Sequence, residues 1–385
     1  MIITIAADVL GEENNGTTVA AMNLIRYLQS VGDTVRILCA DQEKKGLPGY
    51  YVVPNRSFGL LADKVLEKNG VKLAKRDEKV VREALLGSDI CHIMLPFELG
   101  KAALRIAREM DIPVTAGFHC QAENFTSHFG LINVRSANWL FYQIIYRRFY
   151  RFADRIHYPT QFIRDVFEQA VRHKTPGRVV SNGVNSCFIP TEVQRPAVLR
   201  DRFVILFIGR LSREKSHRVL VEAAARSRYR DRIRLIFAGS GPKKEQILRL
   251  ARRLDIEPPI IHFFTHEELT GVINMADLYC HPAEIEIEAI GCLEAISCGL
   301  VPVISDSGRS ATRAFALDER NLFRCNDPSD LAEKIDYWIS HPEEKEACRK
   351  RYEHESVRFE LEHCMKMTRE ILREAYEEKK GHILP

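Results

Sequence analysis

The sequence lacks the features of a secreted, membrane-spanning or metal-stabilised protein. No run of about 18 apolar residues occurs anywhere, and the opening MIITIAADVL has neither a basic region nor a small-residue cleavage site. The 10 cysteines form no CxxC pair and no Cys/His spacing typical of zinc. We therefore expect no signal peptide, no transmembrane span and no metal. A reduced cytoplasmic location is expected, in which the cysteines are small buried apolar residues.

Low-complexity tracts and a strong net charge are also missing. The 385 residues are 45% hydrophobic and 28% charged, which is typical of a soluble globular chain long enough for two domains. The 56 basic residues exceed the 52 acidic ones by a net charge of only +4, so we expect no nucleic-acid partner. The excess is local, because residues 135–155 contain five arginines and a single acid, Asp154.

Short β-branched runs alternate with helical patterns in two successive series. This alternation predicts an α/β protein with two Rossmann-like domains. The expected strands are residues 2–7, 34–40, 90–95, 113–119 and 155–160 in the first series, and 202–209, 233–241, 259–264, 276–282 and 301–305 in the second. The segment SNGVNSCFIPTEVQRPAVLRD between them has no periodicity, so we predict domains at 1–194 and 195–362. Residues 363–385 are expected to form a helix that packs back on the first domain.

Two strand ends in the second series carry candidate anion-binding groups. VILFIGRLSREKS ends a buried strand at Gly209 and then supplies Arg210 and Lys215, which could grip a diphosphate from different sides. FAGSGPKKE places Gly239 before a helix start, where backbone N–H groups could meet an anion. A solvated basic loop and a packing turn are the structural alternatives, and neither segment matches the GxGxxG pattern.

Two glutamates in HPAEIEIEAIGCLEAISCGLVPVIS stand in otherwise apolar surroundings. Glu286 falls in a predicted loop and Glu294 in the helix that follows, where a carboxylate could accept hydrogen bonds from sugar hydroxyls. In the first domain, Asn15 and Gly16 precede a helix and form a third glycine loop at a strand end. Each of these residues, taken singly, also has a capping or structural explanation.

Taken together, these segments resemble the retaining GT-B-fold glycosyltransferases of family 4, also called glycosyl transferases group 1. The resemblance rests on GRLSREK, FAGSGP and the two glutamates with seven residues between them, in that order. It covers the second domain almost completely and the first domain more loosely. It implies two Rossmann-like domains that face a central cleft, with a C-terminal helix that crosses back to the first domain.

The resemblance also implies roles for particular residues. Arg210 and Lys215 would bind the diphosphate of a nucleotide-sugar donor without a metal or other cofactor, and Glu294 would hold the ribose. Glu286 would contact the donor sugar beside the reacting carbon. In the first domain, His119 resembles a histidine near the donor sugar, and Gly16 matches a glycine near the phosphates. His119 also has a plain reading as a strand-end histidine that is satisfied by its surroundings.

The implied reaction is transfer of a hexose, with UDP-sugars favoured, and with retention at the anomeric carbon. A front-face route suits a site with no obvious nucleophile, and double displacement through Glu286 is the alternative. The sequence departs from the family where Ile287, Glu288 and Ala289 replace the frequent Gly-Phe-Gly. FFTHEEL is also shorter than the usual base-lining segment, which leaves the donor open.

The acceptor should be bound by the first domain, whose most unusual stretch is NWLFYQIIYRRFYRFADRIHYPT. At about 100° per residue, a helix through this stretch would place an arginine sector of Arg148, Arg151 and Arg155 beside an apolar one, as in an interfacial helix at a membrane surface. We expect contacts to a membrane or an acceptor from four residues: Trp139, Arg147, Arg148 and Arg151.

The favoured function is a peripheral enzyme on the inner face of the plasma membrane that glycosylates a lipid such as diacylglycerol or ceramide. The alternatives are an enzyme with a soluble glycan or small-molecule acceptor, and a non-catalytic nucleotide-sugar-binding partner subunit.

Overall fold

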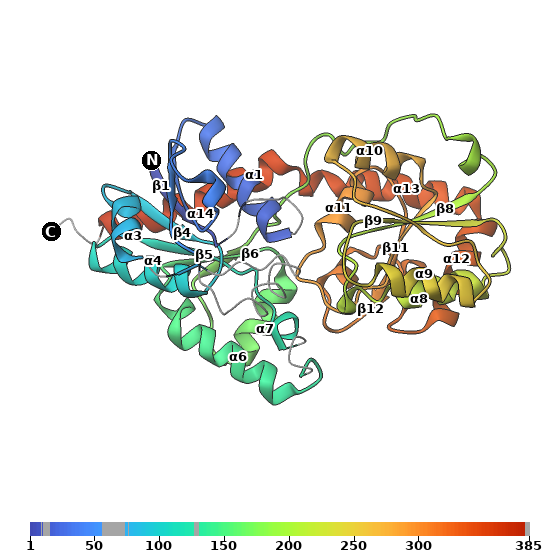
Figure 1. Ribbon diagram of the computed structural model, residues 1–385, viewed down its shortest axis with the longest axis horizontal. Coiled ribbons are helices and arrows are strands. Elements are labelled where there is room, and N and C mark those ends of the chain that lie inside the picture. Colours follow the sequence, from blue (N-terminus) through green and yellow to red (C-terminus); the bar gives the residue numbers. More distant parts are fainter. Residues whose placement is uncertain (9, 11–15, 56–73, 76, 127–130, 382–385) are drawn as a thin grey trace. The chain divides into compact units, whose positions relative to one another are not determined.

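A computed structural model describes residues 1–8, 10, 16–55, 74–75, 77–126 and 131–381. The chain forms two compact units, Met1–Asn182 with Glu362–Pro385, and Gly183–Leu361 (Figure 1). The units therefore divide after Asn182, earlier than the predicted boundary near residue 195. The reason is a backbone ladder in which Val184 N–H donates to Phe359 at 2.7 Å and Leu361 N–H donates to Val184 at 2.9 Å. This ladder attaches the connecting segment to the second unit.

The first unit is built on a seven-stranded sheet in the order β3-β2-β1-β4-β5-β6-β7, with every pair parallel. Its strands are β1 (Ile2–Ala6), β2 (Thr34–Cys39), β3 (Tyr50–Val52), β4 (Ile90–Ile93), β5 (Val114–Gly117), β6 (Arg155–Tyr158) and β7 (Gly177–Val179). The helices between them are α1 (Gly16–Ser30), η1 (Gln42–Lys44), α3 (Glu78–Leu85), α4 (Glu98–Glu109), α5 (Ala122–Thr126), α6 (Arg135–Arg148), η3 (Tyr150–Phe152) and α7 (Gln161–Val171). Helix starts follow local capping, since Asp77 accepts from Lys79 and Val80 N–H at the start of α3.

The second unit repeats this design with six parallel strands in the order β10-β9-β8-β11-β12-β13. They are β8 (Phe203–Ile208), β9 (Ile233–Ala238), β10 (Ile260–His262), β11 (Leu278–His281), β12 (Pro302–Asp306) and β13 (Leu322–Arg324). The helical elements are η4 (Ala197–Leu199), η5 (Arg213–Lys215), α8 (His217–Arg226), α9 (Lys244–Arg253), α10 (His266–Met275), α11 (Ile290–Ser297), η6 (Ala311–Phe315), η7 (Glu319–Asn321), α12 (Pro328–Ser340), α13 (Pro342–Ser356) and η8 (Val357–Phe359).

The strand order reverses direction between β8 and β11 in the second unit. In open α/β sheets, ligands bind at the carboxyl ends of the strands beside such a switch point. The α/β class and the two Rossmann-like units predicted from the sequence are confirmed.

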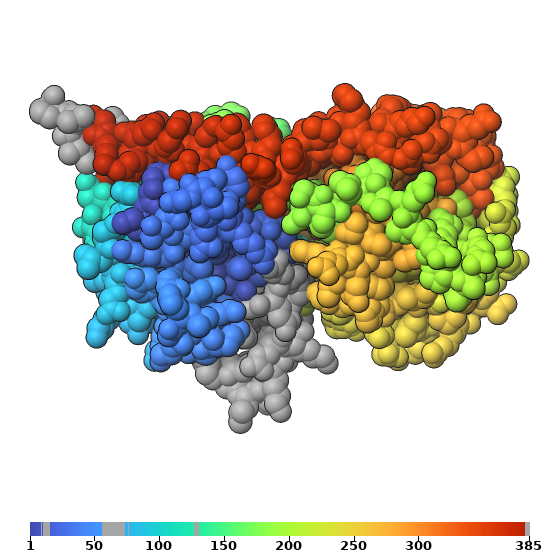
Figure 2. All heavy atoms as spheres, turned by 90° about the horizontal axis from the view of Figure 1, so that it is seen from above, coloured from blue at the N-terminus to red at the C-terminus, as the bar shows by residue number. Residues whose placement is uncertain are grey.

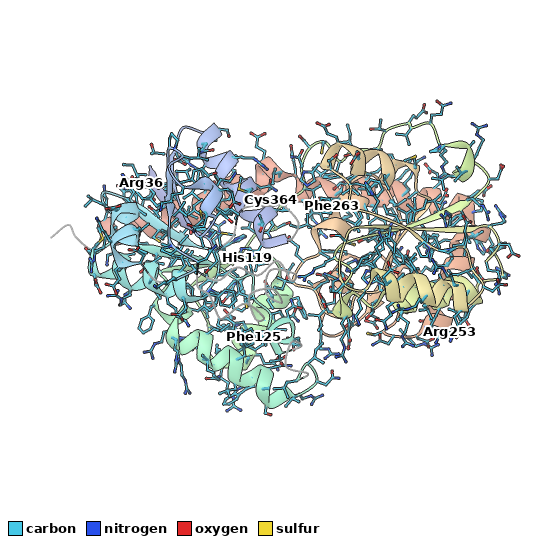
Figure 3. All side chains as sticks on the ribbon, in the orientation of Figure 1. Arg36, His119, Phe125, Arg253, Phe263 and Cys364 are labelled. Atoms are coloured by element: carbon cyan, nitrogen blue, oxygen red, sulfur yellow. The ribbon has the colours of Figure 1, made fainter. Side chains whose placement is uncertain are left out.

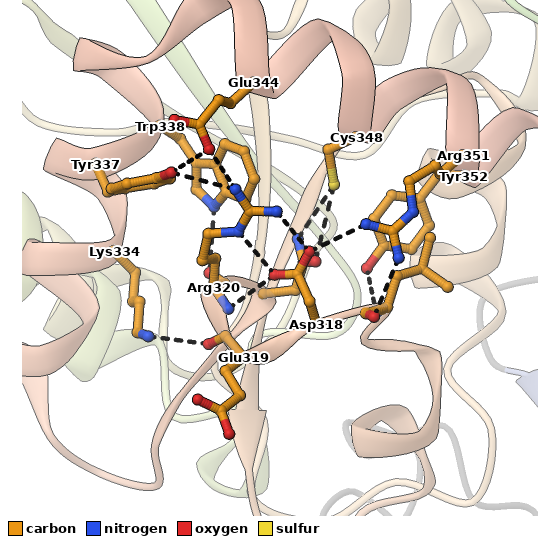
Figure 4. A network of polar contacts seen from close by, with 12 residues as sticks. Asp318, Glu319, Arg320, Lys334, Tyr337, Trp338, Glu344, Cys348, Arg351 and Tyr352 are labelled. Atoms are coloured by element: carbon orange, nitrogen blue, oxygen red, sulfur yellow. Dashed lines mark hydrogen bonds and ion pairs between the residues drawn. The ribbon is translucent and has the colours of Figure 1, made fainter.

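A polar network fastens α12 and α13 beside the end of β13 (Figure 4). Arg320 donates to Asp318 at 2.8 Å and to the Tyr337 hydroxyl at 3.2 Å, and it also contacts Glu344. Arg351 on α13 reaches the same Asp318 at 3.2 Å. The hydrogen bonds from Arg320 are the main reason that the pKa of Asp318 is lowered. The network joins η7, α12 and α13 within the second unit.

The last helix, α14 (Leu361–Gly381), lies on the first unit (Figure 2). Its Arg369 donates to the buried carboxylate of Asp33 at 2.6 and 3.0 Å, and the chain's amino group reaches the same carboxylate at 2.9 Å. Glu374 pairs with Arg178 at 2.6 Å, one helical turn further along. None of the helices in the described ranges is both long enough and apolar enough to cross a membrane.

Candidate functional site

The carboxyl ends of β8 and β9 touch through glycines. A Cβ atom on Gly239 would lie 2.0 Å from the Gly209 carbonyl oxygen, so no other residue fits there. The Gly239 N–H already donates to the His262 carbonyl at 2.7 Å. Gly209, with φ of +146°, and Gly241, with φ of +153°, hold conformations that only glycine adopts readily. The described contacts of Gly239 thus fit the packing alternative better than a direct donor contact.

Lys215 follows β8 at the end of η5 and is directed to Glu286. The Lys215 ammonium contacts the Glu286 carboxylate, and their side chains are only 18% and 11% exposed. The backbone N–H of Glu284 donates to the Glu214 carbonyl at 2.9 Å, which holds the two loops together. The predicted diphosphate-binding lysine is therefore neutralised by the predicted sugar-binding glutamate. Arg210 is half-buried in the same loop.

Two residues of β11 extend this pair into a buried chain of hydrogen bonds. The Tyr279 hydroxyl lies 2.9 Å from His281 Nδ1, and His281 Nε2 lies 3.1 Å from the Glu286 carboxylate. An Nε2–H tautomer satisfies both contacts, because the tyrosine then donates to Nδ1 and the histidine donates to Glu286. The sequence analysis missed both residues. The available signal was their spacing of two in a strand, which places them on one face next to Glu286.

This chain of contacts fixes the charge of Glu286. Burial opposes ionisation of the carboxyl, but the charge of Lys215 and the hydrogen bond from His281 prevail and lower its pKa to about 2. Burial also lowers the pKa of His281, so the imidazole is neutral. Glu286 is thus a carboxylate at any physiological pH, and it holds no proton to give to a leaving group.

The loop that carries Glu286 is held in place by hydrogen bonds to its backbone. The Glu286 carbonyl accepts from Ala311 N–H at 2.9 Å, and the Glu284 carbonyl accepts from the Ser307 hydroxyl at 2.7 Å. Ala289 has φ of +66° and ψ of 72° at the start of α11, a left-handed conformation that disfavours a Cβ atom. Glu288, the extra acid at this departure from the family pattern, is buried. These contacts and the left-handed residue constrain the loop between β11 and α11.

Glu294 stands on α11 in a different environment. Its side chain is 7% exposed and has no hydrogen-bond or ion-pair partner among the residues that the structure describes. Burial raises the pKa of this carboxyl to about 7. A buried carboxyl without donors is costly, so Glu294 is ready to accept hydrogen bonds from a ligand.

The first unit contains the other predicted site residues. Gly16 is the exposed first residue of α1, and Asn15 lies outside the described residues. His119 follows β5 (Figure 3). Within the described ranges, its buried Nε2 has no hydrogen-bond partner. Burial, together with nearby His157 and His92, lowers the pKa of His119 to about 3, so its ring is neutral. The expectation of a fully satisfied strand-end histidine is not met, because one ring nitrogen is left unpaired.

Asp8, just beyond β1, was not singled out from the sequence. Burial raises the pKa of its carboxyl to about 7, and its Oδ1 is buried with no partner in the described part of the chain. An acid directly after the buried run IITIAA was the signal that could have found it.

The aromatic and arginine-rich stretch is not one continuous helix. Helix α6 ends at Arg148, η3 follows, and Arg155 begins β6, where it pairs with Glu378. The predicted sector of Arg148, Arg151 and Arg155 is therefore wrong, since a helical projection does not apply beyond Arg148.

The exposed face of α6 nevertheless combines apolar and basic side chains. Leu140 and Ile144 are 52% and 42% exposed, and Arg147 and Arg148 flank them without an ion-pair partner among the described residues. Trp139 is 49% exposed on the same helix. Arg151 is exposed in η3, and its guanidinium lies 4.4 Å from the centre of the Phe152 ring.

Two family models match the chain in succession. Glycosyltransferase Family 4 matches residues 14–186, and Glycosyl transferases group 1 matches residues 189–355. The chain therefore belongs to this family of glycosyltransferases, as the sequence resemblance indicated.

Curated relatives and solved structures agree with this assignment. An alpha-monoglucosyldiacylglycerol synthase of Streptococcus pneumoniae is 25% identical over 56% of this chain, and the match spans only 51% of that protein. The enzyme of the same name from Acholeplasma laidlawii is 21% identical over 86% of each chain. The Anabaena HepE structure, in complex with UDP and glucose, has a TM-score of 0.74 at 16% identity over 97% of this chain and 100% of that one. The two-unit architecture is the GT-B fold.

Proposed function

We propose that this protein transfers a hexose from a UDP-sugar to a hydroxyl group of a membrane lipid, with retention at the anomeric carbon and without a metal ion. The observation that carries the proposal is the buried chain from Tyr279 through His281 and Glu286 to Lys215. A buried ion pair of this kind contributes little net stability. Its presence is therefore better explained by ligand binding than by a structural role. The glycolipid-synthesising relatives support a lipid acceptor and a glucosyl donor.

In the proposed donor complex, the diphosphate meets Lys215 and Arg210. Two cations at the leaving group stabilise the negative charge that develops there, which is usually the largest contribution to catalysis. These side chains would do the work of a divalent metal. Glu294 accepts hydrogen bonds from the ribose hydroxyls, which supply the donors that its carboxyl lacks in the free protein.

The charge on Glu286 bears on the reaction route. A carboxylate with its pKa at about 2 is a weak base and a stabilised, weak nucleophile. Its fixed negative charge suits the positive charge that develops on the sugar ring when the leaving group departs. A front-face transfer, in which the departing phosphate helps to deprotonate the acceptor hydroxyl, fits this better than a glycosyl-enzyme intermediate. In this proposal, His119 would lie near the donor sugar and Gly16 near the phosphates.

The exposed face of α6 is proposed to bind the bilayer that supplies the acceptor. Leu140 and Ile144 would enter the interface while Arg147 and Arg148 meet lipid phosphates. This location would be peripheral and on the cytoplasmic leaflet.

Release of free nucleotide from UDP- and GDP-sugars tests the proposal, measured with and without liposomes that contain diacylglycerol or ceramide. We expect release that depends on lipid, persists in EDTA and is lost in Glu286→Gln. Glu333→Gln, an exposed glutamate on α12, is the matched control and should behave as wild type. Release that is indifferent to lipid would move the acceptor to a soluble glycan. No release with any donor would favour a non-catalytic subunit.

A further inference from the structure

A cavity lies in the first unit, between α5, α6 and α7. Its volume is about 530 Å³, a size typical of sites for small ligands. The polar and aromatic residues that line it are Glu123, Arg135, Asn138, Trp139, Tyr142 and Arg172. None of these residues belongs to the donor site proposed above.

Two positively charged side chains line the cavity. Arg135 begins α6, and Arg172 ends α7 in a left-handed conformation with φ of 55°. Neither guanidinium forms an ion pair with a residue in the described part of the chain. Guanidinium groups bind phosphate oxygens in a bidentate manner, so this pair is suited to a phosphate diester.

A negative charge lines the same cavity. Glu123 Oε1 accepts from Asn138 at 3.4 Å, whereas Oε2 is buried without a hydrogen-bond partner among the described residues. The carboxylate lies near the Tyr142 hydroxyl and contributes, after burial itself, to raising the pKa of that phenol. A phosphate alone would meet repulsion from this carboxylate. A ligand that carries an ammonium group as well would supply the missing N–H donor.

The aromatic side chains favour the same ligand. Trp139 and Tyr142 both line the cavity, and aromatic faces attract cations. The cavity therefore offers two cations for a phosphate, and a carboxylate with two aromatic rings for an ammonium group. Choline has no N–H group to donate, so it would leave Glu123 Oε2 unsatisfied.

The position of the cavity indicates where such a ligand would come from. Trp139 is 49% exposed at the cavity, and Leu140, its neighbour on α6, is 52% exposed. We propose that this cavity binds the phosphoethanolamine headgroup of a bilayer lipid and thereby seats α6 on the membrane. The inference rests on the proposed membrane-lipid function, which it extends by a lipid-recognition site distinct from donor binding.

Binding of the full chain to vesicles tests the inference. Three kinds of vesicle are compared: phosphatidylcholine alone, the same lipid with phosphatidylethanolamine, and the same lipid with phosphatidylglycerol. We expect about tenfold tighter binding to the ethanolamine-containing vesicles than to phosphatidylcholine alone. Soluble glycerophosphoethanolamine should compete at millimolar concentration, and a failure to compete would count against binding of the headgroup in the cavity.

Variants separate the two halves of the headgroup. Arg135→Gln with Arg172→Gln should abolish the preference for ethanolamine and weaken binding to phosphatidylglycerol. Glu123→Gln should remove the preference for ethanolamine over choline and leave phosphatidylglycerol binding intact. Arg252→Gln with Arg253→Gln, at two exposed residues of α9, is the charge-matched control for the double arginine variant. Circular dichroism melting shows that each variant is folded.

The outcomes distinguish this inference from the proposed function. Equal wild-type binding to choline and ethanolamine vesicles, with lipid-dependent turnover intact, would overturn the headgroup site alone. An ethanolamine preference that survives in both variant proteins would overturn it as well. Absence of binding to every vesicle, with turnover on a soluble acceptor, would overturn the membrane-lipid function itself.

Discussion

Replacing Glu286 by glutamine is expected to weaken catalysis and, at the same time, to strengthen nucleotide binding. In the free protein, Glu286 forms an ion pair with the ammonium group of Lys215. The Lys215 side chain is 18% exposed and the Glu286 side chain is 11% exposed. A donor diphosphate has to displace this carboxylate before it can bind the lysine. Glutamine keeps an oxygen for His281 or Lys215 but removes the competing charge.

The size of the effect follows from the burial of the pair. Removing one partner of a buried ion pair costs about 3–5 kcal/mol, and glutamine should cost about 3 kcal/mol because it keeps a hydrogen bond. The ligand-free melting temperature should then fall by roughly 10 °C. A nucleoside diphosphate supplies the missing negative charge, so its dissociation constant should fall about tenfold, equal to about 1.4 kcal/mol.

Titration of UDP and GDP by calorimetry, with melting curves at each ligand concentration, measures both effects. The rise in melting temperature at saturating nucleotide should be larger in Glu286→Gln than in wild type. Glu333→Gln provides the control for loss of one negative charge. Unchanged or weaker nucleotide binding in a folded Glu286→Gln protein would refute the assignment of Lys215 to the diphosphate.

Three further predictions concern neighbouring residues. Burial raises the pKa of Glu294 to about 7, so between pH 4.5 and 7 the folded protein holds a proton that the unfolded chain has released. As the pH rises through this range, the free energy of unfolding should fall by about 1.4 kcal/mol per pH unit. Glu294→Gln should remove this slope in denaturant titrations across the same range. Ala289→Gly should raise the free energy of unfolding by about 1 kcal/mol, because glycine relieves the left-handed conformation, and an unchanged urea midpoint would contradict the strain. His281→Leu should lower kcat at least tenfold, because it removes the hydrogen bond to Glu286. His281→Gln can still donate to Glu286 and should retain more activity. Equal losses in the two variants would show that this hydrogen bond is unimportant.

The sequence was sufficient for those parts of the protein that local pattern determines. The alternation of strands and helices predicted both sheets, and the spacing of Glu286 and Glu294 identified the segment where β11 leads into α11. The arginine sector failed because residue periodicity does not report where a helix stops. Phe149, at the end of α6, is fully buried, and the chain turns there to reach β6.

Other features depend on contacts between distant residues. The pairing of Lys215 with Glu286 joins residues 71 apart in sequence, and no local pattern predicts it. The requirement for glycine at position 239 comes from the Gly209 carbonyl on the neighbouring strand. Only the arrangement of β8 and β9 reveals this close approach. The cavity that Arg135 and Arg172 line depends in the same way on how α6 lies against α7.

The last helix changes how the protein can be divided for experiments. Residues 183–361 are continuous in sequence, whereas the first unit is assembled from residues 1–182 and from the helix that starts at the end of the second unit. In the absence of α14, Asp33 would lose Arg369 and keep a buried negative charge with only the amino terminus as its partner. The second unit is thus the natural fragment for studying nucleotide binding in isolation. A fragment of the first unit should be produced with residues 362–381 supplied, either as a separate peptide or by joining them to residue 182 through a linker.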